Sequence, residues 1–327
     1  MLTYILRRIV AMVPLLLLVS IITFIIIQLP PGDFFDSLMA EMAENGSQQD
    51  SATMEKLREH YGLDKPLYMQ YLRWVGGWFR GDFGWSLEWS SPVLPLVVSK
   101  MRYTLLLGFF SLLFMVTVAL PLGVYSATHQ YTISDHVMST ISFLGLCLPG
   151  FLLALLWMFF GAIVLRIDVG GVISSEMKNA PMSFAKLWDY FNHLWPPAII
   201  LGFASTAQLH RIMRGSVLDV LGQQYITTAR AKGLKERNVI NKYVVRIAIN
   251  PLISVMALEI PKIISASALV GIVLSVPTLG PLFLRSLLSQ DMYLAGTVLL
   301  CMTLMLMIAN LVADILLAWA DPRIRYS

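Results

Sequence analysis

The side chains best suited to chemistry outside the apolar segments lie in a polar, basic stretch at residues 223–251. Residues 225–232 contain no proline or glycine, so they are expected to form a short helix. Gly233 suits the left-handed position just past a helix end, and Leu234 is available for the apolar contact that often accompanies this cap. Glu236 then falls in the first turn of a second helix, where the helix dipole favours its charge. The stretch is therefore predicted to form a helix, a stop and a second helix.

The residue types in the first of these helices favour binding to another protein rather than catalysis. Small side chains would let a partner approach the backbone closely, and a fringe of cations surrounds them. The residues assigned to this docking helix are Tyr225, Thr228, Ala229, Arg230, Ala231, Lys232, Gly233 and Leu234. The alternative is that a basic cytosolic stretch only orients the protein or touches anionic lipid headgroups.

A second group of candidate residues lies inside predicted membrane-spanning segments. Glu259 and Lys262 stand in an apolar run, and intramembrane charges are costly enough to indicate the lining of a translocation path. Because they are three residues apart, they could instead pair on one helix face and neutralise each other. Pro149 and Pro261 are predicted to break their helices, which indicates either hinges beside a path or simple packing kinks.

The sequence carries none of the motifs that indicate catalysis or metal binding. It has no GxxxxGK[ST] phosphate loop, no HExxH and no GxSxG. Cys147 and Cys301 are its only cysteines and both lie in predicted spans, so neither a disulfide framework nor a metal site is expected. No catalytic residue, metal ligand or bound cofactor is assigned to this chain, and any ATP hydrolysis would need another polypeptide.

The composition is typical of an integral membrane protein. Of the 327 residues, 57% are hydrophobic and 13% are charged, whereas soluble domains carry about 25% charged residues. A helix needs about 20 mostly apolar residues to cross the hydrocarbon core, and six stretches qualify. They are residues 9–29, 103–127, 137–165, 196–211, 251–276 and 293–319. The predicted fold class is all-α, although Gln208, His210 and Arg211 interrupt the end of the fourth stretch and Arg214 follows it.

The positive charges predict which side of the membrane each end faces. Six crossings put both termini on one side, and basic residues flank the first and last spans: Arg7, Arg8, Arg323 and Arg325. These charges and the basic stretch place the N- and C-termini in the cytosol. Residues 30–102 hold ten acidic and seven basic residues, which is consistent with their translocation. The net charge of +4 thus reflects orientation, and no nucleic-acid partner is expected.

The chain is predicted to divide just before the second span. Residues 1–102 hold the first transmembrane helix and an external amphipathic segment rich in aromatic side chains. The spacing of Tyr71, Trp74 and Trp78 predicts one face of a helix lying on the membrane surface, with a platform for a docking protein or a sugar-like ligand as the alternative. Residues 103–327 form a five-helix core that carries the basic stretch.

Several motifs, in order, resemble one family of transport proteins. The basic stretch reads TARAKGLKERNVI and is followed by Asn250 and Pro251, similar to the coupling loop of ABC-importer permeases of the oligopeptide, dipeptide and nickel branch. The resemblance runs almost end to end, through YILRRI, LPPGD, YGLDKPLYMQYLRW, RGDFGWSLEWSSPV, PTLG and the terminal DPRIRY. Independent motifs in the same order argue against coincidence.

This resemblance implies a type I ABC-importer permease fold with six transmembrane helices in the bacterial plasma (inner) membrane. Residues 225–234 would form the coupling helix, seated in a groove of a cytosolic ATP-binding subunit. Two such subunits, closing on ATP and Mg, would push this helix and switch the membrane domain between inward-facing and outward-facing states. The other implied partners are a homologous second permease subunit, a periplasmic or lipid-anchored solute-binding protein and membrane lipid.

The chain departs from the pattern of this branch at several positions. Phe34 stands where the branch has the proline of GDP, Lys235 replaces a serine, Gly271 replaces a glutamate and Thr278 replaces the first glycine of a PGLG-like turn. The charges at Glu259 and Lys262 are additional. Imported oligopeptides, oligosaccharides and nickel chelates therefore all remain open as the solute.

Two other functions remain open beside the ATP-driven importer. A secondary transporter that needs no ATPase would have ion sites at the membrane midplane, inverted repeats and activity when expressed alone. No repeat is apparent in the sequence, and the cytosolic docking helix would then have no role. A purely structural membrane scaffold would leave the predicted breaks at Pro149 and Pro261 without a purpose.

Overall fold

The computed structural model describes residues 2–29, 32, 34–36, 38–39, 56, 59, 64–166, 169–174, 176–177 and 180–320. Most of the acidic external segment, including Asp33, therefore lies outside the described residues, as do the terminal Arg323 and Arg325. The chain divides into two units, which are described one at a time. The first comprises Met1–Tyr103 and Thr278–Met305, and the second comprises Thr104–Pro277 and Leu306–Ser327.

Four helices in the described part of the chain are long and apolar enough to cross a membrane. They cover Leu6–Gln28 of α1 (Leu2–Gln28), all of α5 (Val93–Thr128), all of α12 (Asn250–Val273), and Met292–Ala318 of α14 (Met292–Ala320). A fifth candidate joins α6 (Ile133–Cys147) to α7 (Gly150–Phe159) and the π-helical segment η1 (Phe160–Leu165), with a bend of 104°. The fourth predicted crossing lies inside the long helix α8 (Phe184–Leu221), whose polar residues keep it from being among these candidates.

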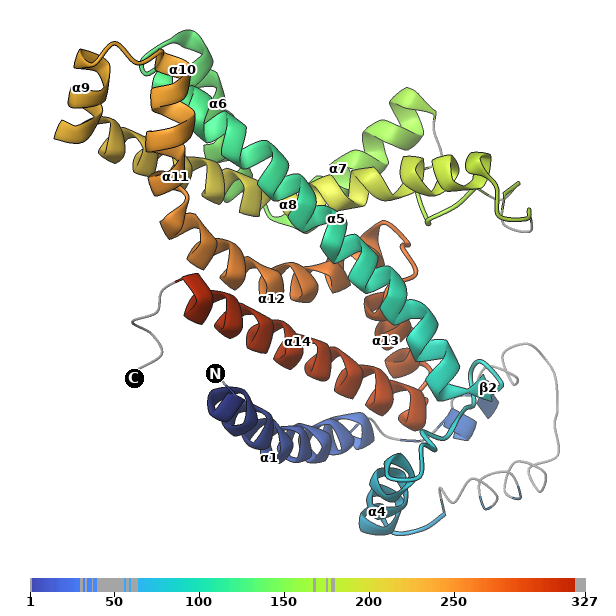
Figure 1. Ribbon diagram of the computed structural model, residues 1–327. Helices are drawn as coiled ribbons and strands as arrows, with labels where there is room; N and C mark the ends of the chain where they lie inside the picture. The colour runs from blue at the N-terminus through green and yellow to red at the C-terminus, as the bar shows by residue number, and fades with distance from the viewer. Residues whose placement is uncertain are drawn as a thin grey trace. The chain divides into compact units, whose positions relative to one another are not determined.

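The bend between α6 and α7 has a local cause. Leu148 ends α6 with ψ of 124°, which is the extended conformation that a following proline imposes on its neighbour. Pro149 is then the N-cap of α7. The predicted break at Pro149 is thus confirmed (Figure 1). The predicted break at Pro261 is wrong, because α12 runs through it without interruption and tolerates a proline inside the helix.

The first unit packs the aromatic face of α4 (Leu67–Trp78) against protein. Trp74 is 2% exposed and stacks on Phe24 of α1 with ring centroids 6.3 Å apart, while Tyr71 meets the same ring edge-on at 5.4 Å. Gly296 lets α14 approach, since a Cβ at this position would overlap the Trp74 indole. The predicted helix is present, but the prediction that this face lies on the membrane is wrong, because α1 and α14 cover it. The large apolar side chains that α4 leaves exposed are Leu67, Tyr68, Met69 and Leu72.

A buried carboxylate joins the short hairpin of β1 (Trp85–Ser86) and β2 (Ser91–Pro92) to the turn between α13 (Leu279–Leu288) and α14. Ser86 Oγ donates to Asp291 Oδ2 at 2.6 Å, and the Leu294 N–H donates to Asp291 Oδ1 at 3.1 Å. Burial raises the pKa of the Asp291 carboxyl, and these hydrogen bonds oppose that rise. The contact explains why α13 and the start of α14 belong to the same unit as the N-terminal segment.

The second unit is built around α8. Ser183 caps its first turn by accepting a hydrogen bond from the Lys186 N–H at 3.3 Å. α8 packs against α6, α7 and α12, and α5 approaches it closely at Gly123, where a Cβ would come within 2.5 Å of Met213 Cβ. The elements after α8 are α9 (Gln224–Ala231), α10 (Glu236–Asn238), the π-helical η2 (Val239–Val244) and α11 (Val245–Ala248). They connect α8 to α12 and contain the basic stretch.

Candidate functional site

The basic stretch ends its first helix where the glycine predicts. α9 has its C-cap at Lys232, and Gly233 adopts a φ of +75°. The Gly233 N–H donates to the Arg230 carbonyl at 2.9 Å. The Leu234 N–H donates to the Ala229 carbonyl at 3.4 Å. These two bonds are the pair that closes a helix through a left-handed residue, so the predicted stop is confirmed.

An exposed ion pair links α9 to the helix that follows it. Arg230 donates from Nη2 to Glu236 Oε1 at 2.6 Å and from Nε to Oε2 at 3.2 Å. Glu236 lies in the first turn of α10, as predicted, and the hydrogen bond from Arg230 lowers the pKa of its carboxyl. The two side chains are 45% and 52% exposed, so water and salt screen the pair. The Arg230–Glu236 pair therefore orients the turn between α9 and α10 but adds little to the stability of the fold.

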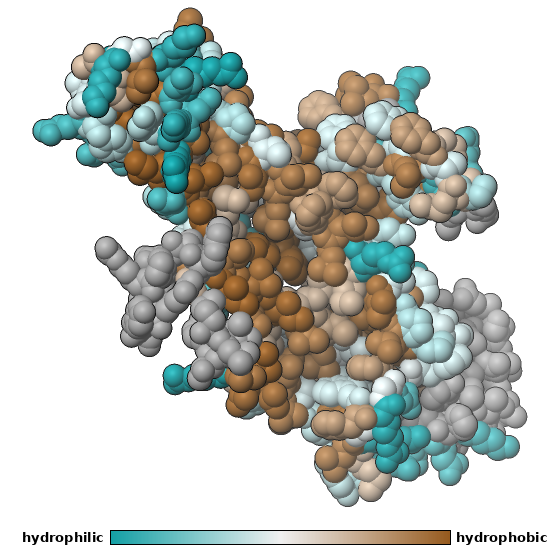
Figure 2. Space-filling model, viewed as in Figure 1, coloured by the Kyte–Doolittle hydropathy of each residue, from teal (hydrophilic) through white to brown (hydrophobic). Residues whose placement is uncertain are grey.

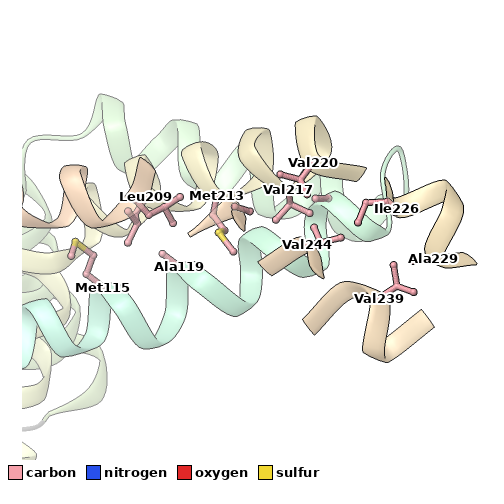
Figure 3. Close-up of a cluster of buried hydrophobic side chains, with 13 residues drawn as sticks. Met115, Ala119, Leu209, Met213, Val217, Val220, Ile226, Ala229, Val239 and Val244 are labelled. Carbon is pink, nitrogen blue, oxygen red and sulfur yellow. The ribbon is translucent and has the colours of Figure 1, made fainter. Parts of the chain in front are cut away.

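Two side chains on one face of α9 hold it against the rest of the second unit. Ile226 is 0% exposed and Ala229 is 6% exposed, and their spacing of three residues puts them on the same face. Figure 3 shows them in a cluster with apolar side chains of α8 and η2: Val217, Val220, Val239 and Val244. Burying an isoleucine side chain such as that of Ile226 stabilises the fold by roughly 1.5–3 kcal/mol. α9 is therefore fixed to the C-terminal end of α8.

The opposite face of α9 is exposed, and hydrophilic residues gather over α9 and α10 in Figure 2. The exposed residues assigned to the docking helix are Tyr225, Thr228, Arg230, Ala231, Lys232, Gly233 and Leu234. Ala229 differs, because it lies one turn from Ile226 and points into the cluster. A partner would meet small side chains at Thr228 and Ala231, with cations beside them.

A groove of about 400 Å³ is the second candidate site, and it brings together three of the predicted path residues. Pro149 lines it from the bend after α6, and Glu259 and Lys262 line it from α12. Pro261 lies on α12 but is not among the lining residues. α8 contributes Ser205 and Gln208. Apolar side chains complete most of the wall, so the polar groups are concentrated on the facing surfaces of α8 and α12.

A polar contact joins α8 to α12 in the wall of this groove. Lys262 Nζ donates to Glu259 Oε1 at 2.7 Å, and Ser205 Oγ donates to Glu259 Oε2 at 2.6 Å. The Glu259 side chain is 3% exposed, whereas that of Lys262 is 60% exposed. The pairing that their spacing predicts is therefore confirmed. Both residues nevertheless line the groove.

Ser205 and Gln208 were missed by the analysis of the sequence, although a signal for them was present. They stand three residues apart in an otherwise apolar part of α8, so they share one helix face. The polarity of Gln208 interrupts the predicted fourth crossing, and it also marks the side of α8 that faces the groove.

A partly buried ion pair nearer the C-terminal end of α8 was also missed. Arg214 donates to both carboxylate oxygens of Asp135, from Nε to Oδ1 and from Nη2 to Oδ2, at 2.8 Å each. Ser126 also donates to this carboxylate, and Asp135 is 2% exposed. The pair borders a cavity of about 190 Å³, and Leu146 lines both this cavity and the larger groove. Because the partners are 79 residues apart, no local pattern connects them.

The sequence matches two family models that together cover nearly all of it. Residues 119–326 match "Binding-protein-dependent transport system inner membrane component", and residues 1–108 match "Binding-prot-dependent transport system membrane comp, N-term". Among curated relatives, the chain is 36% identical over 327 residues to the oligopeptide transport system permease protein AppB of Bacillus subtilis (strain 168), covering 100% of both chains. It is 31% identical over 326 residues to the glutathione transport system permease protein GsiC of Escherichia coli (strain K12), again covering 100% of both.

A solved structure shares the fold. The chain is similar to one from the MetNI methionine ABC transporter in inward-facing conformations, with a TM-score of 0.53, 17% identity, and coverage of 69% of this chain and 96% of that one. The family models place the chain as the membrane permease subunit, not the ATPase, of such a system. The chain belongs to the family of binding-protein-dependent transport system inner membrane components.

Proposed function

We propose that this permease imports peptides in an ATP-driven ABC transporter, and that α9 is the helix gripped by a cytosolic ATP-binding subunit. The observation that carries the proposal is the packing of α9. Its inner face is fixed to α8 through Ile226, and its outer face is exposed and cationic. A partner can therefore push on α9 without first ordering it. Relatives named for oligopeptide and glutathione transport favour a peptide over an oligosaccharide or a nickel chelate.

α8 provides a route from α9 to the groove. Val217 and Val220 of α8 pack with Ile226, and Ser205 of the same helix bonds Glu259. The helix is continuous between these points, a length of roughly 22 Å from Ser205 to Val220. Nucleotide-driven closure of the ATP-binding subunits would displace α9, tilt α8 and alter the groove. The groove would then open alternately to the two sides of the membrane.

The proposed topology has six crossings, with both termini in the cytosol. It adds α8 to the four long apolar helices and the bent α6–α7 pair. α8 is 38 residues long, or roughly 57 Å, so its apolar part is long enough to cross if its polar side faces a path instead of lipid. The basic residues around α9 then lie on the cytosolic side.

The proposed complex contains partners that supply what this chain lacks. A homologous second permease, most simply a different chain, would complete the path, and two ATP-binding subunits would use ATP and Mg. A periplasmic or lipid-anchored binding protein would deliver the peptide to the external side. The family description supports this requirement for a binding protein.

Reconstitution tests the proposal. Vesicles that hold this chain, a second permease and two ATP-binding subunits should accumulate a labelled tripeptide against its gradient when binding protein and ATP are supplied. Vesicles that hold this chain alone should accumulate none. Uphill uptake by this chain alone would identify a secondary transporter and overturn the proposal.

Replacing Gly233 with valine should weaken capture of the ATP-binding subunit by about fivefold to thirtyfold. A left-handed backbone costs a non-glycine residue about 1–2 kcal/mol, and a tenfold change corresponds to about 1.4 kcal/mol. A Cβ at Gly233 would meet nothing within 4 Å, so the effect isolates backbone strain from steric overlap. Capture is measured by titrating the purified subunit onto the tagged permease.

Gly222 offers the matched control for this variant. It lies at the C-cap of α8 with φ of −77°, which any residue adopts, and it is also exposed. Gly222→Val should therefore leave capture near that of the unmodified chain. Equal losses for Gly222→Val and Gly233→Val would rule out the cap of α9 as the cause.

A further inference from the structure

Lys262 has an unusual position for a charged residue in a membrane protein. It stands near the middle of α12, one of the four apolar helices able to span a membrane, yet its side chain is 60% exposed. An ammonium group facing hydrocarbon at that depth is costly. This face of α12 must therefore look onto water or onto another polar surface. The groove that Lys262 lines is large enough to hold that water.

The carboxylate that pairs with Lys262 is buried in the wall of the groove. Glu259 accepts one hydrogen bond from Lys262 and one from Ser205, and its side chain is 3% exposed. Lys262 donates one of its three N–H groups to Glu259, which leaves two for other acceptors. The groove thus offers hydrogen-bond donors from the exposed Lys262, while the compensating negative charge on Glu259 is nearly inaccessible to solvent. Among the described residues that line it, no other is charged.

We propose that the Glu259–Lys262 pair makes the solute path electrically neutral, so that it passes peptides with little regard to the charge of their side chains. In this proposal Lys262 donates to carbonyl oxygens of the peptide backbone, which every peptide carries. Glu259 is the positioning residue, because it cancels the charge of Lys262 and directs its ammonium group. The inference rests on the proposed function, since it assigns a role to the groove as the peptide path.

The proposal predicts which peptide, acidic or basic, each charge-changing variant should favour. Removing either partner leaves one net charge in a confined site, where its interaction with a charged side chain about 10 Å away changes occupancy by about tenfold at an effective dielectric constant near 20. Glu259→Gln leaves a positive groove, which should favour acidic peptides. Lys262→Gln leaves a negative groove, which should favour basic peptides. The double variant is neutral again and should resemble the unmodified chain.

The experiment uses the complete transporter in vesicles, with binding protein saturated by one of two tripeptides, Ala-Glu-Ala or Ala-Lys-Ala. Saturation removes the receptor's own preference from the comparison. The measured quantity is the ratio of initial uptake rates, acidic over basic. The net charge favours one peptide about tenfold and disfavours the other about tenfold, so relative to the unmodified chain the ratio should rise about a hundredfold in Glu259→Gln and fall about a hundredfold in Lys262→Gln. It should return in the double variant. Unchanged ratios in both single variants that still transport would overturn the proposal.

A second measurement covers single variants that fail to assemble. Lys262→Cys is made in a chain with Cys147→Ala and Cys301→Ala and is treated with water-soluble methanethiosulfonate reagents, one anionic and one cationic. The cationic adduct should restore the ratio of the unmodified chain, and the anionic adduct should favour the basic peptide. Failure of both reagents to label the site would place Lys262 outside an aqueous path and also overturn the proposal.

These outcomes are separate from failure of the proposed function. If the unmodified complex shows no ATP-dependent uptake, the function itself is wrong. If uptake and ATP dependence are normal while the ratios do not move, only the role of the Glu259–Lys262 pair is wrong.

Discussion

Replacing Ile226 with aspartate is expected to reduce ATP-driven uptake by about a hundredfold or more. Ile226 is 0% exposed between α8 and η2, so a carboxylate there has no partner to compensate its burial. An uncompensated buried charge costs about 3–5 kcal/mol, which corresponds to more than a hundredfold at about 1.4 kcal/mol for each factor of ten. Release of α9 from α8 relieves that cost, since a short element held by few buried contacts can open locally. The helix would then be mobile and could not transmit a push.

The same substitution at an exposed isoleucine separates burial from chemistry. Ile247 on α11 is 43% exposed, so Ile247→Asp should retain most of the uptake. Both variants are compared by ATP-dependent uptake, and by protease cleavage within α9 as a readout of local opening. Normal uptake in Ile226→Asp would show that α9 does not need its anchor. Equal losses of uptake in the two variants would show that the burial of Ile226 is not the cause of the loss.

Replacing Arg214 with alanine is expected to lower the free energy of unfolding by about 3–5 kcal/mol, because it leaves a buried carboxylate without its cation. The Asp135 side chain is 3% exposed and receives two hydrogen bonds from the charged guanidinium of Arg214. Only the uncharged donors Ser126 and the Tyr131 N–H would then remain among the contacts described for it. Unfolding in mixed detergent and dodecyl sulfate micelles measures the change.

Arg211 provides the control, since it lines the same cavity but is exposed. Arg211→Ala should change the free energy of unfolding by less than about 0.5 kcal/mol. The double variant Asp135→Ala with Arg214→Ala should be more stable than Arg214→Ala alone, because no orphan charge is left. If Arg214→Ala lowers the free energy of unfolding no more than Arg211→Ala does, the Asp135–Arg214 pair does not stabilise the fold.

The features that the sequence predicts well are those set by neighbouring residues. The stop after α9 depends on the freedom of Gly233 to adopt positive φ, and the bend after α6 depends on the effect of Pro149 on Leu148. Both are one-residue effects that need no distant partner. Pro261 shows the limit of this approach. Whether a proline inside a helix breaks it depends on how the surroundings accommodate the lost hydrogen bond, and α12 remains continuous.

Features that depend on distant partners were predicted poorly. The spacing of Tyr71, Trp74 and Trp78 correctly predicts an amphipathic helix but cannot tell a lipid surface from a protein one. Two distant residues determine that the surface is protein. Phe24 stacks on Trp74, and Gly296, far along the chain, leaves room for the Trp74 indole. Ser205 and Glu259, 54 residues apart, were likewise joined only by the packing of α8 on α12.

The number of candidate spans depends on how apolar each helix is, and lining a path makes a membrane-crossing helix less apolar. A helix that crosses lipid and also lines a path must carry polar residues on one side, which lowers its overall apolar character. Gln208, His210 and Arg211 make α8 less apolar, and Gln208 lines the groove. The described residues therefore contain four candidate spans, or five with the bent pair, while the proposed topology requires α8 as well.

Site-specific cross-linking from α9 tests the central proposal most directly. A photoreactive side chain at Thr228, on the exposed face of α9, should cross-link to the ATP-binding subunit in the assembled transporter. The same group at Trp89, which is 39% exposed in the hairpin of the first unit, should not. Absence of the Thr228 cross-link, or modification of Thr228→Cys by an impermeant reagent applied only outside the cell membrane, would contradict a cytosolic coupling role for α9.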